Sequence, residues 1–103
     1  MAADVKIRGN LKDTTATIKL LIPHPMETGT RRDADGHLIP AKYIQSVTLE
    51  KNGQLVMKGN WGPSVSKDPY LSLQIKNCAA GDVIKVDWVD NTGESGTGEL
   101  TLK

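Results

Sequence analysis

Aliphatic residues recur at every second position along much of this chain, which is the spacing of β-strands that bury one face. The longest such run is Ala16, Ile18, Leu20 and Ile22. The other alternating runs are Val5 and Ile7; Tyr43, Val47 and Leu49; Leu55 and Met57; Leu71, Leu73 and Ile75; Ile84, Val86 and Trp88; and Leu100 and Leu102. No window keeps the period of an amphipathic helix. The pattern predicts six or seven strands and an all-β fold.

Turn residues separate these runs. Asn52 and Gly53 lie between two alternating segments and tolerate the positive φ that a tight hairpin requires, and segments 80–82 and 91–93 have similar turn chemistry. Short strands at this spacing in about 100 residues are typical of an immunoglobulin-like antiparallel β-sandwich. The Cys…Trp…Cys signature of antibody domains is absent. We therefore expect a single domain of this class over residues 1–103.

Residues 23–42 interrupt the alternation, with three prolines and two glycines in twenty positions. Connections longer than about 12 to 15 residues are uncommon in compact domains, and they are often functional or disordered. Leu38 and Ile39, together with prolines at both ends of the segment, indicate an ordered loop that packs onto the body of the domain. We therefore expect functional residues in this loop.

The same segment holds side chains with the right atoms for a metal site, namely His24, Glu27, Asp33, Asp35 and His37. Their spacing does not fit one. If Gly36 were the glycine of an EF-hand loop, the first and twelfth ligand positions would fall on the cations Arg31 and Lys42. Zinc spacing such as HExxH is also absent. We expect no bound metal or cofactor, and we interpret the segment as a hydrogen-bonded polar turn with two surface imidazoles.

Nucleophilic and general acid–base motifs are equally weak. Residues 93–96 (GESG) lack one spacer of a Gly-x-Ser-x-Gly elbow, and a hairpin tip is the better interpretation. The possible carboxylate pairs, Asp87 with Asp90 and Glu94 with Glu99, fall on polar strands and turns, where we expect them to be solvated. No catalytic residue is assigned.

Cys78 and the two tryptophans each have a structural and a functional interpretation. Cys78 follows a strand end, where a small buried residue is expected, although nearby lysines would favour a reactive thiolate. Trp88 shares the inward register of its strand and should be core. Trp61 lies between two glycines and should be partly exposed, as interface aromatics often are.

Charge and hydropathy limit the possible partners. Thirteen basic and twelve acidic residues give a net charge of +1, and the signs alternate along the chain, so nucleic acid is not an expected partner. The apolar runs are too short for a membrane span or for the core of a signal peptide. We expect a cytosolic protein, or one whose export depends on something other than its own N-terminus.

Three blocks of sequence resemble one known family. Residues 18–45 (IKLLIPHPMETGTRRDADGHLIPAKYIQ) are similar to the signature of the SoxZ family of bacterial thiosulfate oxidation. Residues 61–71 (WGPSVSKDPYL) and 80–91 (AGDVIKVDWVDN) resemble later blocks of the same family, in the same order. The resemblance covers nearly the whole chain.

This resemblance implies an immunoglobulin-like sandwich that pairs with SoxY, the carrier subunit whose C-terminal glycine-rich arm bears the cysteine for covalent sulfur intermediates. The present chain ends GELTLK, without a Gly-Gly-Cys terminus, and so resembles the partner subunit. Such a subunit is non-catalytic, stabilises SoxY and helps to present it to Sox enzymes, including a c-type cytochrome and a metal-dependent hydrolase. In this family the partner carries the export signal, so we expect a periplasmic heterodimer.

Two other functions stay open: a small metal- or thiol-dependent redox enzyme using His24, His37 or Cys78, and a generic adhesion module. For the heterodimer, large anchors outside the inward registers are expected at the interface. We predict that the partner surface includes Met26, Arg31, Arg32, Trp61 and Tyr70. Pairing along an edge strand beside them is possible. Alternatively, the loop covers one end of the sandwich and the partner binds a flat sheet face.

Overall fold

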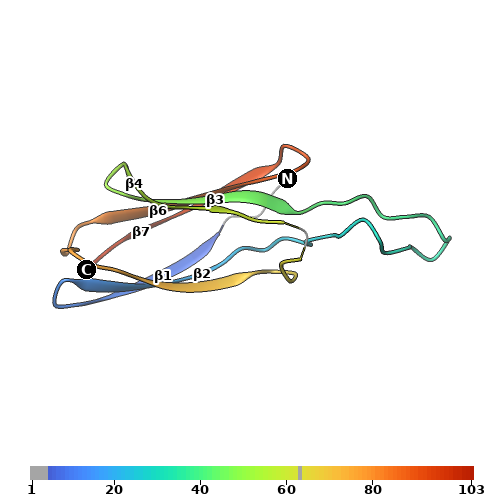
Figure 1. The fold of residues 1–103 in the computed structure, drawn as a ribbon. Helices are drawn as coiled ribbons and strands as arrows, with labels where there is room; N and C mark the ends of the chain where they lie inside the picture. The colour runs from blue at the N-terminus through green and yellow to red at the C-terminus, as the bar shows by residue number, and fades with distance from the viewer. Residues whose placement is uncertain (1–4, 63) are drawn as a thin grey trace.

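The fold is an immunoglobulin-like β-sandwich, seen in a computed structural model that describes residues 5–62 and 64–103 (Figure 1). Two antiparallel sheets face each other, with strand orders β1-β2-β5 and β4-β3-β6-β7. The seven strands are β1 (Lys6–Lys12), β2 (Thr15–Leu21), β3 (Ile44–Lys51), β4 (Gln54–Asn60), β5 (Tyr70–Ile75), β6 (Val83–Asp90) and β7 (Ser95–Thr101). The predicted fold class is confirmed. No helix in the described residues is long and apolar enough to cross a membrane.

The core lies between the sheets and follows the alternation in the sequence. In β6 the side chains of Ile84, Val86 and Trp88 point inward and are almost fully buried. β2 contributes the same pattern from the opposite sheet, with Ile18 and Leu20 inside. Burying one aliphatic side chain contributes roughly 1.5–3 kcal/mol, so these rows supply the main stabilisation of the sandwich.

Strand β7 begins earlier than the sequence indicates. We predicted a hairpin tip over 93–96 and a strand only around Leu100, but β7 already starts at Ser95. Gly96 and Gly98 occupy inward positions of β7, where neighbouring groups leave no room for a side chain. A Cβ on Gly96 would lie 2.7 Å from Cε2 of Trp88. A Cβ on Gly98 would lie 2.8 Å from that of Val5. These glycines therefore complement the core without giving an apolar signal.

Strand β4 departs from its predicted register at one residue. Leu55, predicted to face inward, is 61% exposed. The pairing of β3 with β4 shifts between Leu49 and Glu50, so that Leu49 lies opposite Met57 but Glu50 lies opposite Leu55. Because Glu50 points away from the core, the bulge turns Leu55 to the same outer side.

The long segment between β2 and β3 projects from the sandwich as an extended arm, which we define as residues 27–42 (Figure 1). It runs out and returns on itself through the isolated bridges of Glu27 with Lys42 and of Arg32 with Leu38. It contributes to the elongated shape of the molecule, 54 × 21 × 20 Å. The prediction that Leu38 anchors this segment on the body was wrong, because that side chain is 53% exposed.

Candidate functional site

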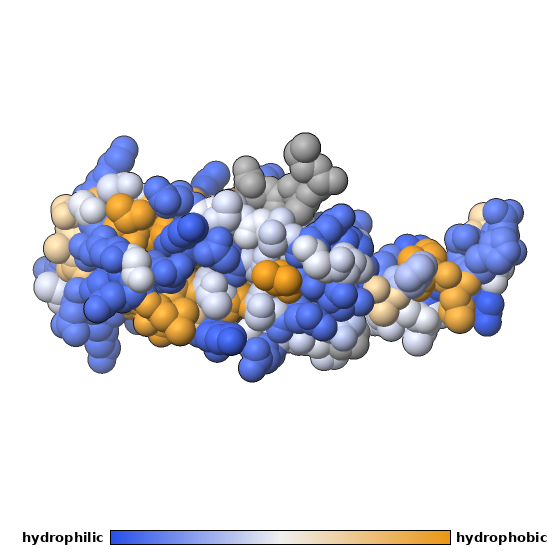
Figure 2. Space-filling model, turned by 90° about the horizontal axis from the view of Figure 1, so that it is seen from above, coloured by the Kyte–Doolittle hydropathy of each residue, from blue (hydrophilic) through white to orange (hydrophobic). Residues whose placement is uncertain are grey.

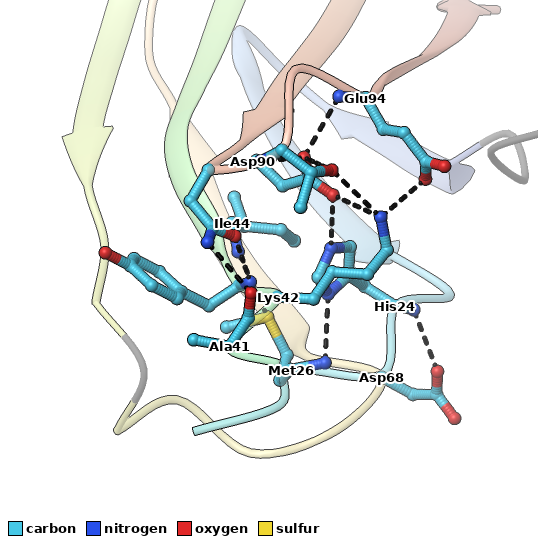
Figure 3. Close-up of polar contacts among 11 residues, drawn as sticks. His24, Met26, Ala41, Lys42, Ile44, Asp68, Asp90 and Glu94 are labelled. Atoms are coloured by element: carbon cyan, nitrogen blue, oxygen red, sulfur yellow. Dashed lines mark hydrogen bonds and ion pairs between the residues drawn. The ribbon is translucent and has the colours of Figure 1, made fainter. Parts of the chain in front are cut away.

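The arm leaves the end of the sandwich at which β2, β4 and β6 finish and β3, β5 and β7 begin. A polar cluster lies at its root, drawn in Figure 3, and we call it the base network: His24, Lys42, Asp90, Thr92 and Glu94. These residues come from the segment after β2, from the returning end of the arm, and from the turn between β6 and β7. The base network therefore joins the arm to both sheets.

His24 is buried, at 3% exposure, and the prediction of a surface imidazole was wrong. Its Nδ1 accepts a hydrogen bond of 3.0 Å from the backbone N–H of Met26. The proton of the neutral ring is consequently on Nε2, which lies 3.0 Å from Oδ2 of Asp90. The ring also meets Trp88 edge to face, with centroids 5.1 Å apart. Both ring nitrogens are thus engaged within the protein.

Asp90 is also buried, at 2% exposure, which corrects the expectation of a solvated carboxylate. Its Oδ1 accepts hydrogen bonds from the backbone N–H groups of Thr92 and Glu94 and from the Thr92 hydroxyl, at 2.7–3.0 Å. Its Oδ2 faces His24 and Lys42. Burial by itself would raise the pKa of Asp90, but the hydrogen bonds from Thr92, Lys42 and His24 together hold it well below its ordinary value.

Lys42 completes the charge balance at the root of the arm. Its Nζ lies 2.8 Å from Oε2 of Glu94 and 2.9 Å from Oδ2 of Asp90. The two carboxylates, Glu94 foremost, raise the pKa of Lys42 despite its partial desolvation. In the adjacent turn, the side-chain amide of Asn91 donates to the carbonyl of Ala41 at 2.9 Å. The β6–β7 turn therefore fixes the returning end of the arm.

The inward register of β2 and β6, continued past the end of β2, predicts that His24 and Asp90 of the base network are buried. His24 and Met26 continue the inward positions of Ile18, Leu20 and Ile22, and Asp90 continues those of β6. Pro23 interrupts the visible alternation after Ile22, which is why His24 and Met26 were predicted to lie at the surface. Met26, predicted as an exposed anchor, is 5% exposed, and its Sδ accepts from the backbone N–H of Ile44.

The arm itself is held by local contacts. Arg31 forms an ion pair with Glu27 and donates through Nε at 3.2 Å, while Arg32 donates to the carbonyl of Gly36 at 2.7 Å. Arg31 and Arg32 are both exposed to solvent. Arg31 and Lys67 also line an open groove of about 540 Å³ beside the root of the arm. Both predicted arginines are therefore in the arm and accessible.

The tip of the arm brings together the carboxylates of Asp33 and Asp35 and the imidazole of His37. All three residues are exposed. Oδ1 of Asp33 accepts hydrogen bonds from the backbone N–H groups of Asp35 and His37, at 2.9 and 3.0 Å. This is the pattern of an Asx-type turn, in which the side chain stabilises its own loop. The tip is accordingly a hydrogen-bonded polar turn.

The two predicted aromatic anchors lie at the same end of the sandwich. Tyr70 begins β5 and is 62% exposed, and Trp61 follows β4, partly buried against Gly59. Of the five predicted interface residues, only Met26 is enclosed in the core.

Cys78 lies at the other end of the strands, where its backbone N–H donates to the carbonyl of Thr14 in the β1–β2 turn. The thiol is buried and points to the carbonyls of Ile75 and Lys76. His24 is at the root of the arm, and His37 is near its tip. The residues of the alternative redox enzyme are therefore not assembled into one site.

Comparison with known protein families identifies the family of this chain. The family described as "Sulphur oxidation protein SoxZ" matches residues 5–101. The chain belongs to the SoxZ family. The SoxZ match includes both sheets and the whole arm, and it gives the protein a role in the Sox system of sulfur oxidation. A search of curated proteins found no match.

Proposed function

We propose that this chain is the non-catalytic subunit of the Sox sulfur carrier, which binds and stabilises the SoxY subunit and helps to present its cysteine to Sox enzymes. Membership of the SoxZ family carries the proposal. The state of Cys78, the one cysteine of the sequence, supports it. That thiol is 2% exposed and lies in a turn between strands, whereas a group that carries intermediates between enzymes must reach several active sites.

The arm is the surface that we assign to the carrier subunit, together with Tyr70 and Trp61. Figure 2 shows apolar side chains on the arm, which stands out from the body. Leu38 and the guanidinium groups of Arg31 and Arg32 are accessible there. Arg is enriched among interface anchors, and burial of the exposed Leu38 side chain against a partner would be favourable. Pairing along the open edge of β5, which begins at Tyr70, would extend the contact.

The base network favours a structural role over catalysis. Neither nitrogen of His24 is free to take a proton from a substrate, because Met26 and Asp90 occupy them. The periplasm follows as the proposed location, reached together with a signal-bearing partner.

Calorimetric titration of the carrier subunit into this chain tests the proposal. The double variant Arg32→Glu/Leu38→Ser replaces two exposed side chains that are neighbours across a backbone bridge in the arm. We expect it to weaken association by about tenfold or more, because it removes a cation and an apolar group from the proposed interface. The control Lys58→Glu/Leu55→Ser makes the same chemical changes on exposed positions of β4 and should bind like the wild type. Absence of binding by the wild-type chain would refute the proposed function. Loss in the control alone would move the interface to the sheet.

A further inference from the structure

The outer face of the β1-β2-β5 sheet gathers positive charge. Lys6, Leu21 and Tyr70 form one cross-strand row, and Arg8, Lys19 and Ser72 form the next. We define the basic face by its charged and large apolar members: Lys6, Arg8, Lys12, Lys19, Leu21 and Tyr70. The other outward positions of these three strands are uncharged: Asn10, Thr15, Thr17, Ser72 and Gln74. Basic and acidic residues alternate along the chain, but the fold separates them here.

Arg8 and Lys19 stand directly opposite each other in the register of β1 and β2. Like charges at this position are destabilising, because the side chains of a cross-strand pair lie close together. Both residues are exposed, and within the described part of the chain no ion pair involves either of them. The sheet therefore carries a like-charge pair that no ion pair of the described residues compensates.

The outer face of the other sheet is balanced. There Lys85 of β6 lies in register with Glu50 of β3 on one side and with Glu99 of β7 on the other. This is the arrangement that stabilises an exposed sheet. The contrast shows that concentration of cations is a property of one face.

Beside the charged pair, the basic face has an apolar end. Leu21 and Tyr70 are cross-strand partners, and with Lys6, Arg8 and Lys19 they line an open depression of about 320 Å³. Tyr and Arg are enriched at protein interfaces, and the surrounding cations favour a partner surface of opposite charge. The depression is open and its cations are exposed, so it lacks the enclosed donors that would hold a small anion.

We propose that the basic face is a docking surface for a carboxylate-rich surface of a second Sox protein, one that acts on the carrier complex. This rests on the proposed function, in which the arm, Trp61 and Tyr70 bind the carrier subunit. The two surfaces then adjoin at Tyr70, and the carrier leaves Arg8 and Lys19 open. Complementary charge would relieve the repulsion between Arg8 and Lys19 and accelerate encounter, as a transient partner requires.

A poly-glutamate peptide labelled with fluorescein probes the face in the isolated chain by anisotropy. At a low ionic strength of about 50 mM, the variant Arg8→Glu/Lys19→Glu should bind about tenfold or more weakly than wild type. The control Lys58→Glu/Lys85→Glu changes net charge equally on the other sheet and should stay within about threefold. Equal loss in both variants would overturn the proposal, because net charge alone would then explain binding.

Two competitors identify other occupants. Displacement of the peptide by sulfate, at a constant ionic strength maintained with chloride, would reveal a small-anion site instead. Tighter binding of a short DNA duplex than of the peptide would favour nucleic acid. Either result would overturn the assignment to a protein surface.

The reconstituted Sox system supplies the functional measurement. With the carrier complex as substrate, Arg8→Glu/Lys19→Glu should raise KM for at least one Sox enzyme, leave kcat unchanged and flatten the dependence of kcat/KM on salt. Unchanged KM with every enzyme would overturn the proposal. Calorimetry with the carrier subunit should give wild-type affinity for this variant, and a loss there would place the carrier on the basic face. Failure of the wild-type chain to bind the carrier refutes only the proposed function, since the peptide result is independent.

Discussion

At Asp90, two backbone N–H groups and three side chains converge on one carboxylate whose side chain has no exposed surface. A buried charge is tolerated only when its hydrogen-bonding capacity is filled, and removal of one member leaves the others unpaired. The groups that converge here come from the turn after β6, from the root of the arm and from the segment after β2. This single residue therefore couples the position of the arm to the core.

Asp90→Ala should lower the free energy of unfolding by about 3–5 kcal/mol, because it leaves His24, Lys42 and the turn amides without their acceptor. Urea denaturation followed by tryptophan fluorescence measures the change. Asp87→Ala, on the same strand but facing outward, is the matched control and should cost less than about 1 kcal/mol. Similar losses in the two variants would contradict the network.

The depressed pKa of Asp90 also predicts how stability depends on pH. The ordinary value is 3.8, and the folded protein holds the group below it, so the ionised carboxylate stabilises the fold above the unfolded-state pKa. This stabilisation is lost as pH falls through the lower pKa of the folded state. We expect the urea midpoint to fall from about pH 5 downward, and less steeply in Asp90→Asn. Equal slopes in wild type and variant would show that other groups dominate.

At the scale of the strands, the two outer faces respond oppositely to loss of a lysine. Lys19→Gln removes a like-charge pair with Arg8 and should stabilise the protein by about 0.2–1 kcal/mol. Lys85→Gln removes the cation that lies in register between Glu50 and Glu99 and should destabilise the protein by a similar amount, about 0.2–1 kcal/mol. Thermal unfolding at low and high salt measures both. Salt should shrink the two effects, and effects of the same sign would contradict this account.

Alternation in the sequence predicted most of the strands, because each buries one face against the opposite sheet. It failed where an element departs from a simple strand. Pro23 is typical of a strand end, but His24 and Met26 continue the inward register beyond it. The bulge in the pairing of β3 with β4 turns Leu55 outward. Gly96 gave no signal at all, since its packing role depends on the ring of Trp88. The base network depends on contacts between distant segments, which no local pattern specifies.

For the molecule as a whole, the fold separates a packed body from a projecting arm, and the base network joins them. Residues 27 and 42 exchange two backbone hydrogen bonds, of 2.6 and 3.0 Å, where the arm meets the body. Such a pair can be closed by a two-residue turn. Replacement of residues 28–41 by Asn-Gly would therefore remove the arm while keeping Glu27, Lys42 and the contacts of the base network.

The shortened chain should fold with a free energy of unfolding within about 1–2 kcal/mol of wild type, since the removed residues contribute little to the core and a shorter loop costs less entropy to close. Its association with the carrier subunit should fall by about a hundredfold or more, because the arm anchors are gone. Calorimetry and urea denaturation on the same preparation give both quantities. The variant Asn52→Ala, in the turn at the opposite end of the strands, should lose some stability without losing association. A stable shortened chain that binds the carrier like wild type would place the interface on the sheets.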